Sequence, residues 1–315
     1  MTISQIKPRR LKSGDTIGII SPASPGAEEH VTAGTTWLEE KGFRVRLGQS
    51  VGQTFGYLSG ADDIRAADIN NMFASPDIDG IICLRGGYGS MRILESVNFD
   101  IIKNNPKVFV GYSDITALHL SIVQRTGLVT FHGPMAASDF GKNPSDYTSD
   151  CFLRAITDTT PLGQIINPPG TQDPIFIVPG SAHGILTGGN LSLIAATLGT
   201  PYEIDTRGKI LCIEEVGEAP YRIDRMLSQL LLAGKFDDCA GIVFAVCADC
   251  EKDDDSPDFS VEEVLRDRLA KLNKPLLYNL YFGHTADKAT IPFGLTANLG
   301  DLADGLVITE SATIE

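Results

Sequence analysis

The sequence predicts an α/β protein whose N-terminal half forms a parallel sheet with helices on both of its faces. Two observations support this fold class. Short runs rich in β-branched residues alternate with helix-like segments between residues 16 and 131. Most of these runs are apolar, as is typical of strands buried on both faces. The chain of 315 residues is also long enough for two domains, each with its own core.

The elements of the first half follow one another closely. Gly42 ends the first helix, because glycine readily adopts the left-handed conformation that closes a helix. In order, we expect a strand at 16–21, a helix at 28–41, a strand at 43–47, a helix at 62–74, a strand at 80–84, a short helix at 90–97, a strand at 108–112, a helix at 115–124 and a strand at 128–131.

Five prolines between Pro161 and Pro179 mark a change in composition. Proline removes backbone donors and restricts the residue before it, so we expect an extended linker at 161–180. The predicted domains are therefore 1–160 and 181–315. In the second we expect strands at 184–188, 209–215 and 241–247, helices at 190–199, 220–234 and 260–272, and short strands near 289–292, 296–299 and 305–309.

The net charge of −14 and the pI near 4.8 argue against a protein that binds nucleic acid or an anionic membrane surface. The N-terminal segment lacks the apolar stretch of a signal peptide, and no apolar run reaches the ~18 residues of a transmembrane helix. We therefore expect a cytoplasmic protein.

A small polar pair, Ser113-Asp114, lies where an apolar strand meets a helix. A serine at such a turn is exposed at the carboxyl edge of the sheet, and the next amide, at a helix N-terminus, can bind an oxyanion. The Gly-Tyr-Ser sequence at 111–113 matches the first half of a G-x-S-x-G nucleophile elbow, but Ile115 replaces the second glycine. Two interpretations follow: Ser113 is a nucleophile with the Asp114 amide as an oxyanion donor, or Ser113 only caps the helix.

The segment CLRGGYGSMRIL at 83–94 follows one strand and precedes a helix. Its paired glycines allow a close backbone approach to a ligand and present N–H groups. Their spacing fits neither nucleotide-binding fingerprint, so a second oxyanion donor near Gly86 or Gly87 is the better interpretation. Arg85 is a candidate for binding a substrate carboxylate, with a surface ion pair as the alternative.

A serine nucleophile needs a base and an orienting acid. Composition alone does not choose among the five histidines, which are His30, His119, His132, His183 and His284. Glu214 ends an apolar strand, where burial of a carboxylate costs on the order of several kcal/mol unless it is paired. Glu214 is therefore a candidate acid, and an ion pair with Arg222 or Arg225 is the alternative.

Six sequence blocks resemble, in the same order, the LD-carboxypeptidase family of serine peptidases, relatives of muramoyltetrapeptide carboxypeptidase. These blocks are RGGYGS, GYSDITALHL, FHGPM, GGNLSLI, IEEVGEAPYRIDRML and FGHTADKATIPFG. The resemblance covers nearly the whole chain and implies a flavodoxin-like N-terminal domain and a smaller, β-rich C-terminal domain.

The resemblance also implies residue roles. The nucleophile of the family falls on Ser113 in the N-terminal domain, and its glutamate and histidine fall on Glu214 and His284 in the C-terminal domain. It implies that the amides of Asp114 and Gly87 form the oxyanion hole. Arg85 and Gly86 are then expected to bind substrate. No metal and no cofactor are implied, and members of the family are commonly homodimers.

The implied reaction is hydrolysis of the L,D amide bond before the terminal D-alanine of murein tetrapeptides, in the recycling of cell-wall peptides. A sister group, similar to the microcin C immunity peptidases, cleaves aminoacyl-nucleotide conjugates and is an alternative. A two-domain small-molecule binding protein is the non-enzymatic alternative. It would account for the glycine loop but not for an aligned serine, glutamate and histidine.

Overall fold

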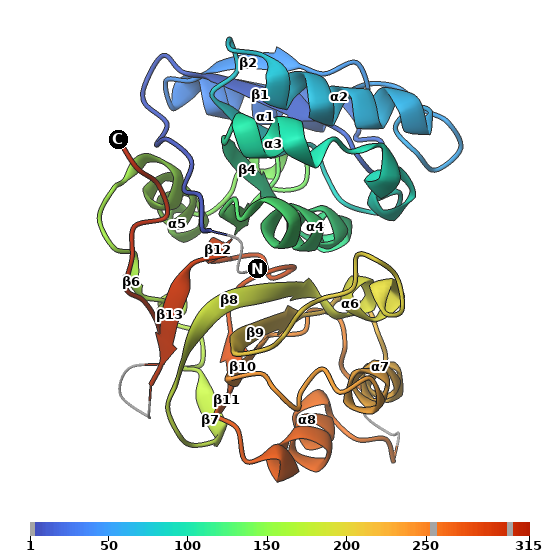
Figure 1. Ribbon diagram of the computed structural model, residues 1–315, viewed down its shortest axis with the longest axis vertical. Coiled ribbons are helices and arrows are strands. Elements are labelled where there is room, and N and C mark those ends of the chain that lie inside the picture. Colours follow the sequence, from blue (N-terminus) through green and yellow to red (C-terminus); the bar gives the residue numbers. More distant parts are fainter. Residues whose placement is uncertain (1–3, 253–256, 301–304) are drawn as a thin grey trace. The chain divides into compact units, whose positions relative to one another are not determined.

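The computed structural model describes residues 4–252, 257–300 and 305–315 (Figure 1). The chain divides into two compact units. Unit 1 consists of Met1–Thr160, Thr290–Gly294 and Ser311–Glu315, and unit 2 consists of Pro161–Ala289 and Leu295–Glu310.

Unit 1 is built on a six-stranded sheet. Its strands are β1 (Thr16–Ile20), β2 (Arg44–Leu47), β3 (Gly80–Cys83), β4 (Val108–Gly111), β5 (Thr130–His132) and β12 (Ile291–Phe293). Strands β2-β1-β3-β4-β5 pair in parallel in this order, and β12 adds antiparallel to β5 at the edge. The order 2-1-3-4-5 is that of flavodoxin-like folds, so the predicted fold class is confirmed.

The helices of unit 1 form two groups, as a sheet covered on both faces requires. They are α1 (Glu28–Glu40), α2 (Asp62–Ala74), α3 (Phe99–Asn104), α4 (Thr116–Thr126) and α5 (Asp146–Thr157), with short 3₁₀ helices η1 (Ser90–Ser96), η2 (Ser113–Ile115) and η3 (Phe140–Lys142). The first group consists of α1, η3 and α5: Trp37 of α1 stacks on Phe140 of η3 at 4.2 Å between ring centroids, and Phe140 contacts Phe152 of α5. The second group consists of α2, α3 and α4, which pack against one another.

The parallel pairing fixes where the functional loops lie. The segments that follow β1, β3 and β4 leave the sheet at the same edge, because the carboxyl ends of parallel strands point the same way. Both β3 and β4 are buried at every position, which anchors the loops after them.

Unit 2 is built on an eight-stranded sheet in the order β6-β14-β13-β8-β9-β10-β11-β7. The strands are β6 (Gly163–Gln164), β7 (Ile175–Val178), β8 (Ala182–Asn190), β9 (Lys209–Glu214), β10 (Gly241–Ala245), β11 (Leu276–Leu280), β13 (Thr296–Leu299) and β14 (Leu306–Ile308). The helices are α6 (Leu191–Thr197), α7 (Pro220–Leu232) and α8 (Val261–Leu269), followed by η4 (Ala270–Leu272). The four central strands are parallel and the outer ones antiparallel, which agrees with the expected β-rich domain.

The division of the chain differs from the simple one expected from sequence. The segment 161–180, expected to be a linker, belongs to unit 2 and carries β6 and β7. Residues 290–294 and 311–315, expected in the second domain, belong to unit 1. The physical reason is strand pairing, since Ile291 to Phe293 hydrogen-bond to β5 and complete the edge of the first sheet.

Candidate active site

Ser113 lies in a sharp turn between β4 and the helical segment after it. Its φ is +65°, and it is the one residue with positive φ in the described part of the chain that is neither Gly, Asn nor Asp. The left-handed region costs an ordinary L-residue on the order of 1–2 kcal/mol, so this conformation is strained. Neither η2 nor α4 is capped by a side-chain hydrogen bond. The alternative that Ser113 serves only as a helix cap therefore lacks the bond that would define it.

The glycine loop after β3 closely approaches this serine. A Cβ built on Gly86 would lie 2.7 Å from Cβ of Ser113, 2.9 Å from its Oγ and 3.3 Å from the amide nitrogen of Asp114. A side chain at position 86 would thus collide with Ser113 and crowd the amide after it. The structure therefore brings Gly86, Ser113 and Asp114 together within unit 1.

The side chain and the backbone amide of Asp114 lie in different surroundings. Its carboxylate is buried and accepts a hydrogen bond from the amide of Ser90 at 2.8 Å, while the Ser90 hydroxyl donates to the Asp114 carbonyl. Burial raises the pKa of this carboxyl, against the opposing effect of the Ser90 bonds. The amide of Asp114 belongs to the first turn of the helical segment, where N–H groups have no intrahelical acceptor.

Arg85 and Gly87 are exposed beside each other on the same loop. The guanidinium of Arg85 donates to the carbonyl of Pro25 at 3.3 Å, and its Nη2 would lie 3.8 Å from a Cβ built on Gly87. No ion pair of Arg85 is found within the described ranges, so the surface ion pair considered from sequence is not seen there. Gly87 has a φ of +112° and faces Ser24, whose hydroxyl accepts from the amide of Tyr88.

Glu214 and His284 form a close pair within unit 2. Glu214 ends β9 with a fully buried side chain, and its Oε2 lies 2.6 Å from Nδ1 of His284. Gly283 allows this approach, because a Cβ there would lie 2.5 Å from the same carboxylate oxygen. Arg222, considered from sequence as a partner of Glu214, pairs instead with Glu218 at 3.2 Å.

The electrostatics of the pair suit a base. Burial by itself lowers the pKa of His284, but the charge and hydrogen bond of Glu214, with the charge of Glu215, outweigh burial and raise it above 6.5. In the tautomer in which Nδ1 donates its proton to Glu214, Nε2 is the basic ring nitrogen.

Three other histidines are in different surroundings. His119 and His132 are buried in a cluster with Phe109 and Phe293, and burial lowers the pKa of His119 to about 4. His183 is bonded through Nδ1 to Asn298 at 2.7 Å.

Two supporting groups were not singled out from the sequence. Glu215, the residue directly after β9, accepts bonds from the side-chain amide of Asn190 at 2.9 Å and from the amide and hydroxyl of Ser192. The block GGNLSLI was noted only as part of a resemblance, and its pairing with the second acid of IEEV could not be read from spacing. These bonds tie the N-terminus of α6 to the strand end that carries Glu214.

Two models of the LD-carboxypeptidase family match the chain, one of its N-terminal domain over residues 17–133 and one of its C-terminal domain over residues 183–299. The chain is 41% identical over 312 residues to the probable murein peptide carboxypeptidase of Bacillus subtilis (strain 168), covering 98% of this chain and 96% of that protein. The chain belongs to the LD-carboxypeptidase family. Its enzymatic class is that of a serine-type carboxypeptidase, which removes the binding-protein alternative.

Two solved structures support this family assignment. The complex of MccF with glutamyl sulfamoyl guanosine has a TM-score of 0.89 at 28% identity and covers 98% of this chain and 99% of that one. The muramoyltetrapeptide carboxypeptidase of Oxalobacter formigenes has a TM-score of 0.81 at 29% identity, covering 93% and 97%. The family thus includes structures named for both substrate classes considered from sequence.

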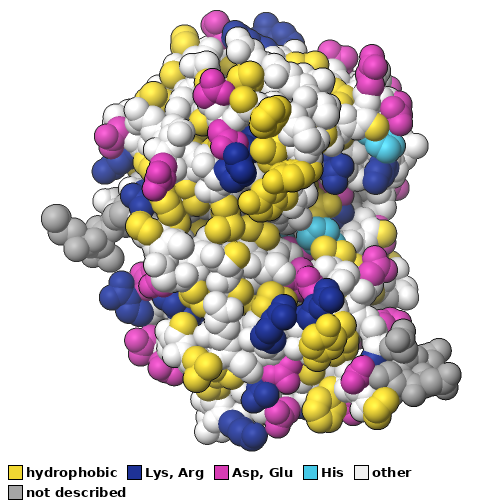
Figure 2. All heavy atoms as spheres, turned by 90° about the vertical axis from the view of Figure 1, so that its right-hand side faces the viewer, with side chains coloured by type: hydrophobic (Ala, Val, Ile, Leu, Met, Phe, Trp, Pro, Cys, Tyr) yellow, Lys and Arg dark blue, Asp and Glu magenta, His cyan; other side chains and the backbone are white. Residues whose placement is uncertain are grey.

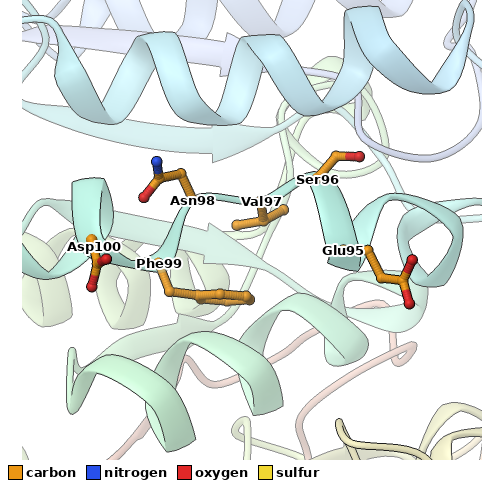
Figure 3. A pocket seen from close by; sticks show the side chains of 6 residues that line it. All are labelled: Glu95, Ser96, Val97, Asn98, Phe99 and Asp100. Carbon is orange, nitrogen blue, oxygen red and sulfur yellow. The ribbon is translucent and has the colours of Figure 1, made fainter.

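Other surface features of this family member do not compete with the candidate site. A hollow of about 400 Å³ lies between η1 and α3, where Phe99 points toward α4, and contains none of the expected site residues (Figure 3). On the face shown in Figure 2, acidic and basic side chains are interspersed. Within the described residues no group of three or more His, Cys, Asp or Glu side chains could hold a metal. Every helix among them is too short or too polar to traverse a bilayer.

Proposed function

We propose that the protein is a serine LD-carboxypeptidase that releases the terminal D-alanine from murein tetrapeptides, with Ser113, Glu214 and His284 as its catalytic triad. The observation that carries this proposal is the strained, uncapped Ser113 pressed against Gly86. The Glu214–His284 pair supports it independently.

In the proposed mechanism, Nε2 of His284 takes the hydroxyl proton of Ser113 while Oγ attacks the carbonyl carbon before D-alanine. The tetrahedral oxyanion accepts hydrogen bonds from the amides of Asp114 and Gly87, each typically worth about 3 kcal/mol. Collapse breaks the C–N bond, and His284 gives its proton to the leaving amine. A water molecule, deprotonated by His284, then hydrolyses the acyl ester and frees Ser113.

Arg85 is proposed to bind the free carboxylate of the D-alanine, with the backbone of Gly86 and Gly87 beside it. Its exposed guanidinium without an ion-pair partner among the described residues supports this role. The test is Arg85→Ala, which should raise KM for the tetrapeptide more than tenfold while leaving kcat within about threefold. A fall in kcat at unchanged KM would assign Arg85 to another role.

The decisive assay measures D-alanine release from an L-Ala-D-Glu-diamino acid-D-Ala tetrapeptide. Ser113→Ala, Glu214→Ala and His284→Ala should each lower kcat by at least about 10³-fold, and the triple variant little further. His183→Ala is the matched histidine control and should retain wild-type turnover. Near-normal turnover in any of the three single variants would remove that residue from the mechanism.

A second candidate function is cleavage of aminoacyl-nucleotide conjugates. It is favoured by the structural likeness to MccF, whose complex holds glutamyl sulfamoyl guanosine. The same enzyme preparation should be offered glutamyl sulfamoyl adenosine beside the tetrapeptide. A kcat/KM higher for the conjugate than for the tetrapeptide would replace the murein assignment.

We also propose a cytoplasmic homodimer, and light scattering of the purified protein tests the dimer.

A further inference from the structure

Arg65 is a fully buried arginine that no motif of the sequence analysis singled out. It lies in the first turns of α2, and its side chain is 0% exposed. Its Nη1 donates to the carbonyls of Pro22 and Gly89, the latter at 2.9 Å, and its Nε donates to the carbonyl of Gly60. Nη2 pairs with Asp62 of the same helix.

The three carbonyls belong to three different loops of unit 1. Pro22 lies in the segment after β1, Gly60 in the segment between β2 and α2, and Gly89 in the glycine loop after β3. One guanidinium therefore cross-links all three. Because a buried charge is costly unless its donors are satisfied, each of these loops is held where its carbonyl can reach Arg65.

The loop that Arg65 holds is the one that touches Ser113. Gly86 of this loop packs against Ser113, and Ser90, the residue after Gly89, donates from its amide to the Asp114 carboxylate and from its hydroxyl to the Asp114 carbonyl. The contacts run from the guanidinium through Gly89 and Ser90 to the carboxylate and carbonyl of Asp114, the residue that follows Ser113.

Arginine is suited to this position and lysine is not. The planar fork presents separate donors in fixed directions, so that it can bind carbonyls of all three loops at once. A lysine keeps the charge but offers a single nitrogen on a shorter reach. Gly89 fits closely against the fork, since a Cβ there would lie 2.8 Å from Nη1.

We propose that Arg65 is a positioning residue that holds the 84–90 loop in the geometry its amides need to stabilise the oxyanion formed at Ser113. This inference rests on the proposed function, because it assigns the loop to the oxyanion hole. Arg65 acts through Gly89 and Ser90.

The experiment compares Arg65→Ala, Arg65→Lys and Arg92→Ala in the D-alanine release assay. Arg92 is the matched control, because its exposed side chain pairs with the same Asp62 at 2.8 Å and donates to none of the three loop carbonyls. A shift of the loop by about 1 Å is expected to cost on the order of 10²-fold in kcat. We expect that loss in Arg65→Ala with KM within threefold, an intermediate loss in Arg65→Lys, and wild-type kinetics in Arg92→Ala.

Amide hydrogen exchange of the same variants gives a readout that does not depend on substrate. Exchange should accelerate in the peptides covering 84–90 and 112–116 of Arg65→Ala and stay at wild-type rates in the strands β1 and β4. Should Arg65→Ala fail to fold, Arg65→Lys and Ser90→Ala carry the test. Ser90→Ala removes only the hydroxyl donor to Asp114 and should lower kcat about tenfold.

A kcat within twofold of wild type in folded Arg65→Ala, or accelerated exchange spread evenly over unit 1, would overturn the positioning role and leave a structural one. If the wild-type protein releases no D-alanine, the proposed function fails. The exchange data then decide the coupling of Arg65 to the loop: faster exchange in 84–90 supports it, and unchanged exchange overturns it.

Discussion

Replacing Ser113 with glycine should remove the nucleophile and stabilise the protein at the same time. Ser113 has a φ of +65°, a conformation that costs an L-residue on the order of 1–2 kcal/mol and glycine almost nothing. Glycine also makes the unfolded chain more flexible, which offsets about 0.4–1 kcal/mol of that gain. No side-chain cap bond of η2 or α4 is lost with the hydroxyl.

Ser113→Ala separates the strain from the chemistry, because alanine also lacks the hydroxyl but keeps the Cβ. We expect the free energy of unfolding of Ser113→Gly to exceed that of Ser113→Ala by about 1 kcal/mol. For a unit of this size, this is a difference of roughly 2–4 °C in Tm. Urea unfolding and differential scanning calorimetry measure it. Neither variant should release D-alanine.

Asn143 provides a matched control away from the candidate site. It has a φ of +55° and an exposed side chain in the loop after η3. Asn143→Gly should likewise be more stable than Asn143→Ala, with turnover unchanged in both. If Ser113→Ala were as stable as Ser113→Gly while the Asn143 pair differed, the strain at Ser113 would be refuted.

Two further predictions concern Gly86 and the Glu214–His284 pair. Gly86→Ala would place a methyl group 2.7 Å from Cβ of Ser113, so kcat should fall about 10²-fold. The control is Gly18→Ala in β1, whose methyl group would lie 2.7 Å from Sδ of Met72 and should lower stability but leave kcat unchanged. Wild-type kcat in Gly86→Ala would contradict the close approach. Because His284 must be neutral to act as a base and its pKa is raised, kcat/KM should rise with pH through a pKa above 6.5. Glu214→Gln removes the charge that raises this pKa, so the acidic limb should move to lower pH while the plateau falls, and an unmoved limb would show that another group titrates.

Much of unit 1 could be predicted because its signals are local. The apolar runs that became β1, β3 and β4 are buried on both faces, so their hydrophobicity is continuous and easily read. The turn at Ser113 was found because a polar pair interrupts two apolar elements. The close approach of Gly86 to Ser113, however, is a contact across 27 residues that no local pattern contains.

The parts that were missed depend on tertiary pairing. β7 lies between prolines, so its sequence predicts a linker, and its pairing with β11 is remote in sequence. β12 joins the sheet of unit 1 after a long passage through unit 2, which a linear division of the chain cannot represent. Arg65 stands in a helix whose sequence gives no sign that an arginine is buried, since its acceptors are carbonyls of three loops.

The environment of Glu214 explains why a buried acid suits the histidine beside it. Its Oε2 bonds to His284, but its Oε1 is buried and has no hydrogen-bond partner among the described residues. An anion so poorly solvated gains most when a positive charge forms next to it, which happens when His284 takes a proton. Adjacent Glu215, by contrast, is satisfied by Asn190 and Ser192. In the proposed mechanism the two acids therefore differ in role: Glu214, with one oxygen unsatisfied, would stabilise the imidazolium of His284, and Glu215, the residue after β9, ties α6 to the end of the strand.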